Sequence, residues 1–303
     1  PDRGRCSLMI QLVVDSTCDM PKSVISDYGI KVLPLQVVID GTPYRDGVDI
    51  TSEELYGVLE QGVFPQTSQI SAVETDEVFR RACEEGKDLI FLSFSSEMSG
   101  TYQLACNVAE SVSKDYPERR IEVIDSEGGC MATGLIAMQA ARWIADGKDM
   151  DETVSLMVEM ISKIQHLFTL DSLDWLAKGG RVPKPAGWVG DALNVKPILH
   201  VADKTMHVVR VVRGRKKTIK TLIEMLKERS NGFNDQLIGI THAKDEDAAE
   251  SVSDMILEAL PGCKTVVLPI GCVLATHLGI GGIGIFFLSG PVPEYDLLDC
   301  DFS

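Results

Sequence analysis

The stretch "LIFLSFSSEMSGTYQLA", residues 89–105, decides the fold assignment. Its first four residues form an unbroken apolar run, which is typical of a strand buried on both faces. Its last residues begin a helical pattern, and between the two lie four serines, a glycine and a threonine. A strand that passes directly into a helix indicates one βα unit of a parallel sheet. The hydroxyl-rich junction raises the question of what it binds.

The rest of the first half repeats this alternation of strand and helix. Two further β-rich runs, residues 11–14 and 121–125, are separated by helical patterns, so we expect a parallel sheet with flanking helices. Thr51 with Glu54 forms a capping-box pattern, and Thr75 is expected to begin the next helix.

Residues 31–46 depart from this alternation, with two extended runs on either side of Asp40 and Gly41. An Asp-Gly pair between extended runs is a hairpin signal. We therefore expect an antiparallel excursion from the parallel sheet over this segment.

Beyond about residue 160 the β-rich runs come more densely, with fewer helices between them. This pattern predicts an α+β second domain with amphipathic helices near 218–229 and 245–259. The runs are residues 166–170, 197–201, 206–212, 236–242, 264–270 and 282–288.

Composition narrows the class of protein. The 303-residue chain carries a formal charge of −16, which makes attraction to nucleic acid or to an anionic membrane surface unfavourable. Its eight cysteines form no CxxC pair, which favours a reducing compartment. No apolar run reaches the length of a membrane span and no signal-peptide profile is visible, so we expect a soluble cytoplasmic protein. Residues 1–8, ahead of Met9, are set aside.

Small polar residues gather where three strands of the predicted sheet end, at residues 15–19, 95–102 and 125–129. Ligands of open α/β sheets bind at this edge. A helix beginning at Ser99 and Gly100 would offer backbone N–H groups to an anion. The alternative is that Ser96 or Ser99 only caps the helix.

Other pieces of a site are scattered along the chain. Residues 65–71 form a further hydroxyl cluster, and residues 172–182 end a helix at paired glycines that direct Arg181. His277 lies ahead of a glycine-rich turn and is expected in a loop. Taken singly, the arginine is a solvated residue and the histidine a structural one. No motif for metal hydrolysis, dinucleotide binding or elbow-serine catalysis is present, so we expect no cofactor.

The order of the motifs resembles the DegV family over residues 10–288. The motifs are "VDSTCD", "TSQ", "SSEMSGTYQ", "VIDS", "SLDWLAKGGRV", "KPIL", "VRGRKK" and "THLGIGGIGIFF". The resemblance implies a bacterial two-domain protein, here residues 1–160 and 161–303, in which an α/β domain and a domain with a largely antiparallel sheet enclose one long-chain fatty acid. It also implies a non-catalytic role: some members present the acid to a separate ATP-dependent fatty acid kinase subunit, which makes the acyl-phosphate.

Residue by residue, the family's carboxylate-binding hydroxyls fall on Thr67 and Ser99, with Ser96 as the alternative to Ser99 and Gly100 beside it. The resemblance assigns Arg181 and His277 to the head-group network and to transfer with the kinase.

The sequence departs from the family pattern in three motifs: "TSQIS" has Ile70 in place of proline, "THLGIGG" at residues 276–282 stands for "THTGPGA", and "RGR" at residues 213–215 stands for "RTR". None of these departures removes a proposed head-group residue. Ile70 and Leu278 could alter the tail channel or the partner surface.

Two other functions stay open from the sequence. The N-terminal architecture is akin to the substrate subunit of dihydroxyacetone kinase, in which a histidine holds a small carbonyl compound covalently, and His277 could act in that way. Alternatively, the protein carries another amphipathic anion without a kinase.

Overall fold

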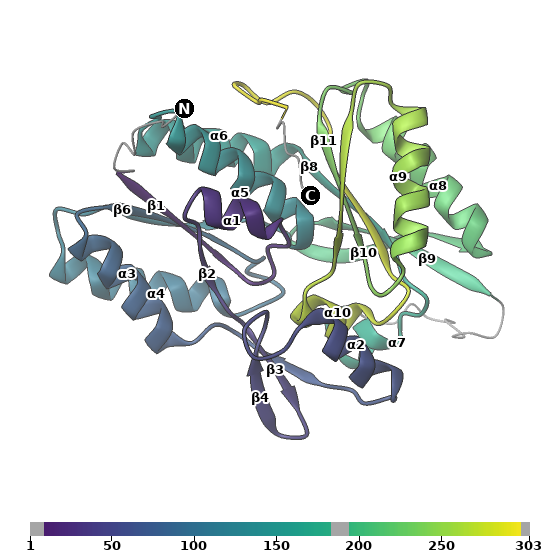
Figure 1. The fold of residues 1–303 in the computed structure, drawn as a ribbon, viewed down its shortest axis with the longest axis horizontal. Coiled ribbons are helices and arrows are strands. Elements are labelled where there is room, and N and C mark those ends of the chain that lie inside the picture. The colour runs from purple at the N-terminus through teal and green to yellow at the C-terminus, as the bar shows by residue number, and fades with distance from the viewer. Residues whose placement is uncertain (1–8, 183–193, 298–303) are drawn as a thin grey trace.

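The computed structural model describes residues 9–182 and 194–297 (Figure 1). Its first sheet has four parallel strands in the order β2-β1-β6-β7, as the alternation of strand and helix predicts. Their bounds are β1 (Ile10–Asp15), β2 (Lys31–Leu33), β6 (Asp88–Ser93) and β7 (Ile121–Asp125).

Helices cover both faces of this sheet, and this explains why β6 is apolar from Leu89 to Leu92. Helices α3 (Ala72–Glu84) and α4 (Thr101–Asp115) pack on one face, and α5 (Cys130–Ala145) packs on the other. Every residue of β6 after Asp88 is buried. Helix α6 (Met150–Lys163) packs against α5.

The second sheet has six strands in the order β10-β9-β8-β13-β11-β12, and only its β11–β12 pair is parallel. Helices α8 (Arg215–Arg229) and α9 (Glu246–Ala259) cover one face, which confirms the two amphipathic helices. The strands are β8 (Ile164–Thr169), β9 (Val195–Ala202), β10 (Thr205–Arg213), β11 (Leu237–His242), β12 (Lys264–Pro269) and β13 (Ile283–Leu288).

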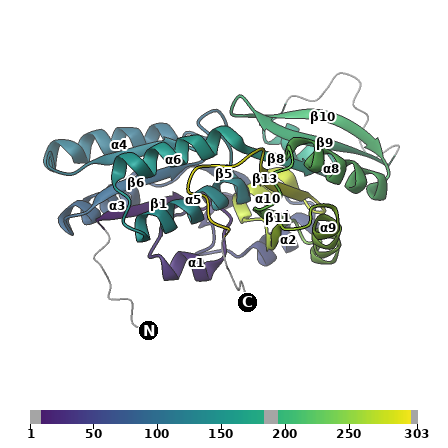
Figure 2. The same cartoon turned by 90° about the horizontal axis from the view of Figure 1, so that it is seen from above.

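Helix α5 lies between the two large sheets, in contact with β1 on one side and with β8, β11 and β13 on the other (Figure 2). All of its residues except Arg142 and Ala145 are buried. A helix that is apolar all round needs cover on every side, and the two sheets provide it. The described strands before residue 160 all belong to other sheets than those after it, and a domain boundary at this point remains our proposal.

A small antiparallel sheet with the order β4-β3-β5 confirms the hairpin. Its strands are β3 (Gln36–Ile39), β4 (Thr42–Arg45) and β5 (Gln66–Ser68). Asp40 and Gly41 have φ angles of 49° and 81°, the left-handed conformation of a tight hairpin turn. The excursion is shorter than expected, because residues 31–33 pair with β1 in the parallel sheet.

Four shorter helices complete the described residues, namely α1 (Lys22–Asp27), α2 (Ser52–Glu60), α7 (Asp174–Lys178) and α10 (Cys272–Leu278). The capping box of Thr51 and Glu54 begins α2 as expected. The expectation that Thr75 begins a helix is wrong: α3 begins at Ala72 with Ser71 as its N-cap, and the Thr75 hydroxyl donates to the Ser71 carbonyl oxygen.

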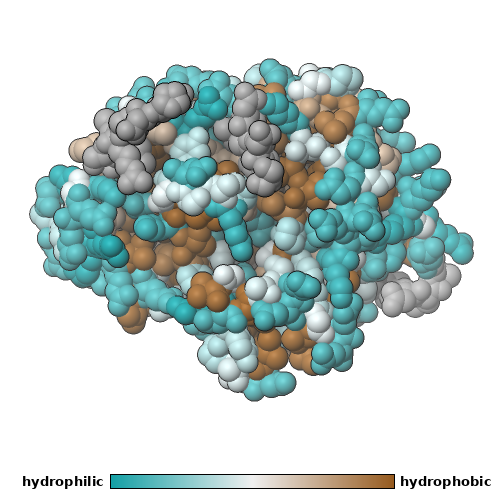
Figure 3. Space-filling view, viewed as in Figure 1, coloured by the Kyte–Doolittle hydropathy of each residue, from teal (hydrophilic) through white to brown (hydrophobic). Residues whose placement is uncertain are grey.

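Hydrophilic residues cover much of the face shown in Figure 3, with patches of apolar residues between them. Within the described ranges, no helix combines the length and apolar character needed to cross a bilayer. Five of the six described cysteines are buried and all six are free thiols, so they behave as small core residues.

Candidate functional site

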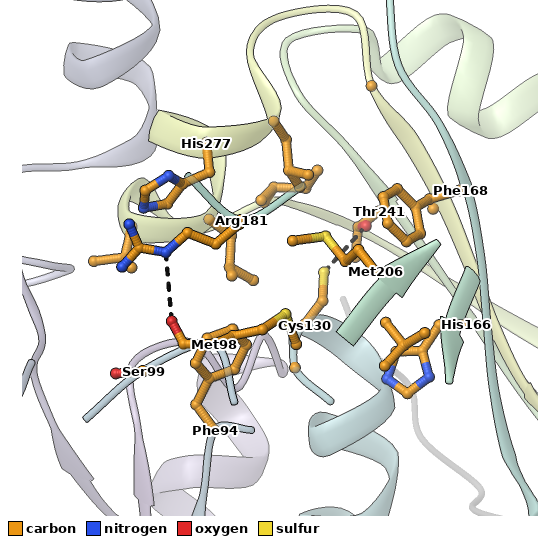
Figure 4. A pocket seen from close by; sticks show the side chains of 18 of the residues that line it. Phe94, Met98, Ser99, Cys130, His166, Phe168, Arg181, Met206, Thr241 and His277 are labelled. Atoms are coloured by element: carbon orange, nitrogen blue, oxygen red, sulfur yellow. Dashed lines mark hydrogen bonds between the residues drawn. The ribbon is translucent and has the colours of Figure 1, made fainter. Parts of the chain in front are cut away.

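A cavity of about 400 Å³ lies between the carboxyl edge of the parallel sheet and the inner face of the six-stranded sheet. Its wall includes Thr67, Ser99, Gly100, Arg181 and His277, so the fold brings together five of the six residues proposed from sequence (Figure 4). The remaining wall is mainly apolar. It includes Phe94, Met98, Phe168, Met206, Leu278 and Phe286.

At one end of the cavity, Thr67 and His277 are joined by a hydrogen bond of 2.8 Å between Oγ1 and Nε2. Thr67 is the middle residue of β5, and His277 lies in the last turn of α10. The expectation of a loop at His277 is therefore wrong. The glycine-rich turn begins only at Gly279, whose φ of 73° ends the helix.

Arg181 reaches the same end of the cavity because the chain reverses after α7. Gly180 has a φ of 72°, and the backbone N–H of Arg181 donates to the Leu176 carbonyl at 3.1 Å, as the paired glycines predict. The guanidinium donates to the carbonyl oxygens of Met98, at 3.4 Å, and Gly179. Among residues 9–182 and 194–297, no carboxylate forms an ion pair with Arg181.

His277 is neutral at physiological pH. Burial and the nearby Arg181 lower its pKa to about 4. Its Nδ1 atom is buried and has no hydrogen-bond partner among the described residues. The ring lies directly over Gly179, where a Cβ atom would come within 2.2 Å of Nδ1. A glycine at this position therefore makes room for the imidazole.

The N-terminus of α4 provides the hydroxyl side of the site. Ser99 Oγ accepts from the backbone N–H of Thr101 at 3.2 Å and lies in the cavity wall, whereas the N-cap of α4 is Gly100. Gly100 leaves room for the side chain of Gln69, because a Cβ atom at position 100 would lie 2.1 Å from the Gln69 Oε1 atom. Ser96 is not among the residues that line the cavity, and its N–H donates to Asp125. The geometry favours Ser99 over Ser96.

Of the three strand ends expected at the site, residues 15–19 do not line the cavity. The carboxylates of Asp15 and Asp19 lie outside the cavity and form hydrogen bonds that hold residues of its wall in place. Asp15 Oδ2 accepts from the Phe94 N–H at 2.6 Å, while Asp19 accepts from the Gly271 N–H and from the Cys130 thiol, both at 3.0 Å. Burial raises the pKa of Asp19 to about 7 and that of Asp15 to about 6.

The apolar wall was not predicted from the sequence. Its residues come from the loop after β6, from α10 and from strands β8, β9, β10 and β13, and they resemble ordinary core residues in the sequence pattern. On β8 the alternation of His166 and Phe168 places both on the cavity side, but alternation alone does not distinguish a cavity from a filled core. Within the described residues, no cluster of metal-ligating side chains occurs.

A family model described as an uncharacterised protein of the DegV family matches residues 9–290. The chain belongs to the DegV family. A DegV domain-containing protein of Clostridium perfringens is 36% identical over 280 residues, which cover 91% of this chain and 96% of the relative. A second from Caldanaerobacter subterraneus is 37% identical over 278 residues, covering 92% of this chain and 98% of that one.

Solved structures of DegV proteins share the fold. A stearic acid-binding protein of Eubacterium ventriosum superposes with a TM-score of 0.85 at 30% identity, covering 92% of this chain and 97% of the other. DegV of Bacillus subtilis, described as a fatty acid binding protein, superposes with a TM-score of 0.81 at 30% identity, covering 92% and 99%. The α/β fold with a parallel and a largely antiparallel sheet is thus the family's fold.

Proposed function

We propose that this protein binds one long-chain fatty acid, with its carboxylate beside Arg181, Thr67 and Ser99 and its tail in the apolar part of the cavity. The observation that carries the proposal is an arginine without an acidic partner, among the described residues, at the end of a largely apolar cavity of about 400 Å³. Cavities of this size are typical of small-molecule sites. The fatty acids bound by related DegV proteins support the same ligand class.

The energetics favour this ligand. A chain of about 16 carbons has about 14 methylenes, whose burial is worth on the order of 10 kcal/mol before ordering costs. A buried carboxylate loses several kcal/mol of hydration and needs charge-assisted donors to offset that loss. Arg181 and the hydroxyls of Thr67 and Ser99 are such donors, which is a role for the hydroxyl-rich junction after β6.

We further propose that the protein presents the acid to a separate ATP-dependent kinase and does not break bonds itself. His277 and Arg181 come from the C-terminal half and meet the hydroxyls of the N-terminal half at the carboxylate end. A neutral imidazole and a fixed positive charge there can orient a carboxylate oxygen toward an arriving phosphoryl group.

The apolar wall also distinguishes this proposal from the small-carbonyl alternative. A short polar compound held on His277 would leave Phe168, Met206 and Phe286 facing an unfilled apolar space. A long tail fills it. Another amphipathic anion would fill it equally well, so the identity of the bound molecule is the decisive measurement.

The test is mass spectrometry of an organic extract of the purified protein, with calorimetric titration of added fatty acid. We expect a fatty acid of roughly 14 to 18 carbons at about one per chain. No extracted lipid together with no uptake by a folded sample would refute the proposal. A different amphipathic anion in the extract would show that the protein binds another class of ligand.

A second experiment separates presentation from covalent catalysis. We expect denatured wild-type protein to show no added mass, and His277→Ala to take up fatty acid but to lose acyl-phosphate formation when ATP and a cognate kinase are added. A small carbonyl adduct that is absent from His277→Ala would instead support the covalent role. Normal acyl-phosphate formation by His277→Ala would show that His277 has only a structural role.

A further inference from the structure

A second cavity, of about 660 Å³, lies behind the first and is more open to solvent, since Glu127 and Asp203 on its rim are exposed. Among the described residues, the two cavities share only His166 and Val201 as lining residues. The second cavity is formed mainly by β8, β9 and the end of α8. Because both side chains border both spaces, they form a wall between them.

This wall stands at the opposite end of the first cavity from the head-group residues. Figure 4 shows Arg181 and His277 on one side of the cavity and His166 on the other, with Met206 and Cys130 between them. An extended molecule with its anionic end at Arg181 would therefore point its other end toward His166.

Packing alone holds the His166 ring in place. A Cβ atom on Gly128 would lie 2.1 Å from its Nε2 atom, so the glycine leaves room for the ring. Phe286 meets the ring edge-on, with centroids 5.8 Å apart. Nε2 is buried without a partner, and no hydrogen bond of this side chain occurs within the described residues. Burial, with a smaller effect of His200, lowers its pKa to about 3, so the ring is neutral and compatible with an apolar neighbour.

The two sides of the wall differ in polarity. On the near side His166 adjoins Phe168 and Phe286, whereas the second cavity is bordered by Glu127, Lys204 and Arg229. A methyl end gains free energy by filling the near side and gains little by passing into the far side.

We propose that His166 and Val201 set the maximum length of the acyl chain that this protein binds. The inference rests on the proposed function and adds the residues that select among fatty acids. Removing the wall joins the two cavities and gives a longer chain a continuous path.

The experiment measures binding constants for saturated fatty acids of roughly 14 to 22 carbons in wild type and in His166→Ala. For wild type we expect affinity to rise with length and then to fall beyond a limit. For His166→Ala we expect the limit to move by about two or more carbons, and the affinity ratio of the first excluded chain to the optimal one to rise at least about tenfold.

His200→Ala is the matched control, because it makes the same change on the neighbouring strand and lines only the second cavity. We expect its length profile to match that of wild type. Val201→Ala opens the wall from the other side and tests it independently if His166→Ala fails to fold.

The possible outcomes separate the two proposals. If wild type binds fatty acids and both folded wall variants keep its length profile, the wall does not select chain length and this inference is wrong. The same holds if His200→Ala shifts the limit as far as His166→Ala does. If wild type binds no fatty acid at all, the proposed function itself fails.

Discussion

At the scale of single residues, Arg181 and His277 share one end of the cavity but contribute different chemistry. Arg181 carries a fixed charge, and His277 is kept neutral with a pKa of about 4 by burial and by that same charge. Neutral imidazole costs less to bury than imidazolium, so the pair presents one positive charge to one carboxylate.

Thr67→Val with Ser99→Ala should weaken fatty-acid binding and leave the protein folded. Each substitution removes a hydroxyl from the cavity wall with little change in volume. Loss of hydrogen bonds to a charged group costs roughly 1.5 to 3 kcal/mol each, so the double variant should bind at least about tenfold more weakly in calorimetry. Ser111→Ala, on the exposed side of α4, is the control. Unchanged affinity of the double variant would place the carboxylate elsewhere.

Gly179→Ala tests the position of the His277 ring. Gly179 has an ordinary right-handed conformation, with φ −73° and ψ −8°, so alanine strains no backbone there. Its Cβ atom would lie 2.2 Å from Nδ1 and must displace the imidazole from Thr67. We expect weaker fatty-acid binding, by about as much as in His277→Ala, measured by the same titration. Wild-type affinity in a folded Gly179→Ala variant would show that the ring position does not matter for binding.

At the scale of elements, two helices connect the halves of the molecule. Helix α5 packs against both large sheets and buries apolar side chains on each side. Helix α10, which carries His277, is fixed at its N-terminus by Asp46, whose carboxylate accepts from the N–H groups of Cys272 and Val273 at 3.0 and 3.2 Å. A carboxylate at this position satisfies donors that the helix itself leaves free.

Gly134→Ala in α5 should destabilise the fold although alanine is the better helix former. A Cβ atom at Gly134 would lie 2.1 Å from the backbone oxygen of Asp19, which cannot move aside as a side chain would. We expect the free energy of unfolding to fall by about 1 to 3 kcal/mol in urea titrations.

Gly57→Ala is the matched control in α2, where a Cβ atom has no neighbour within 4 Å. There we expect the helix propensity of alanine to add up to about 1 kcal/mol of stability. Equal effects of the two substitutions would contradict close packing of α5 against the loop after β1.

At the scale of the whole molecule, buried carboxyl groups and buried histidines give opposite pH dependences. Asp19 has a folded pKa of about 7, raised mainly by burial from an unfolded value near 3.9. As pH falls from about 8 to 4, the Asp19 carboxyl binds a proton in the folded state before it does so in the unfolded state, so its contribution to stability rises. His166 and His277, whose folded pKa values are about 3 and 4, bind protons first in the unfolded state below about pH 7.5 and largely cancel the contributions of Asp19 and Asp15.

We therefore expect the free energy of unfolding of wild type minus that of Asp19→Asn, from urea titrations of ligand-free protein at several pH values, to increase as pH falls from about 8 to 5. Asp19→Asn lacks the carboxyl group that titrates near pH 7, so in the limb above about pH 6.5 its stability should fall with decreasing pH more steeply than that of wild type, because His166 and His277 are then less compensated. Reduced net negative charge at lower pH also adds stability, and the variant isolates the Asp19 contribution from it. An unchanged upper limb in folded Asp19→Asn would mean that Asp19 is ionised throughout this range.

The sequence by itself determined features that depend on local chemistry. The apolar run of β6 predicts a strand covered on both faces, and the Asp40–Gly41 pair predicts a left-handed hairpin turn. The motif order predicts the family and the fold. The same motifs led to Thr67, Ser99, Gly100, Arg181 and His277, which line one cavity.

Only the tertiary structure decided what surrounds those residues. Thr67 and His277 are 210 positions apart in the chain, yet they share a hydrogen bond. Ser96 and Ser99 are equivalent in the sequence, and the course of the chain into α4 brings only Ser99 to the cavity wall. The apolar wall and His166 look like ordinary core residues, because burial and alternation are the same whether the space beside them is filled or left for a ligand. That space lies between two sheets that are formed by distant parts of the chain and whose side chains do not fill it.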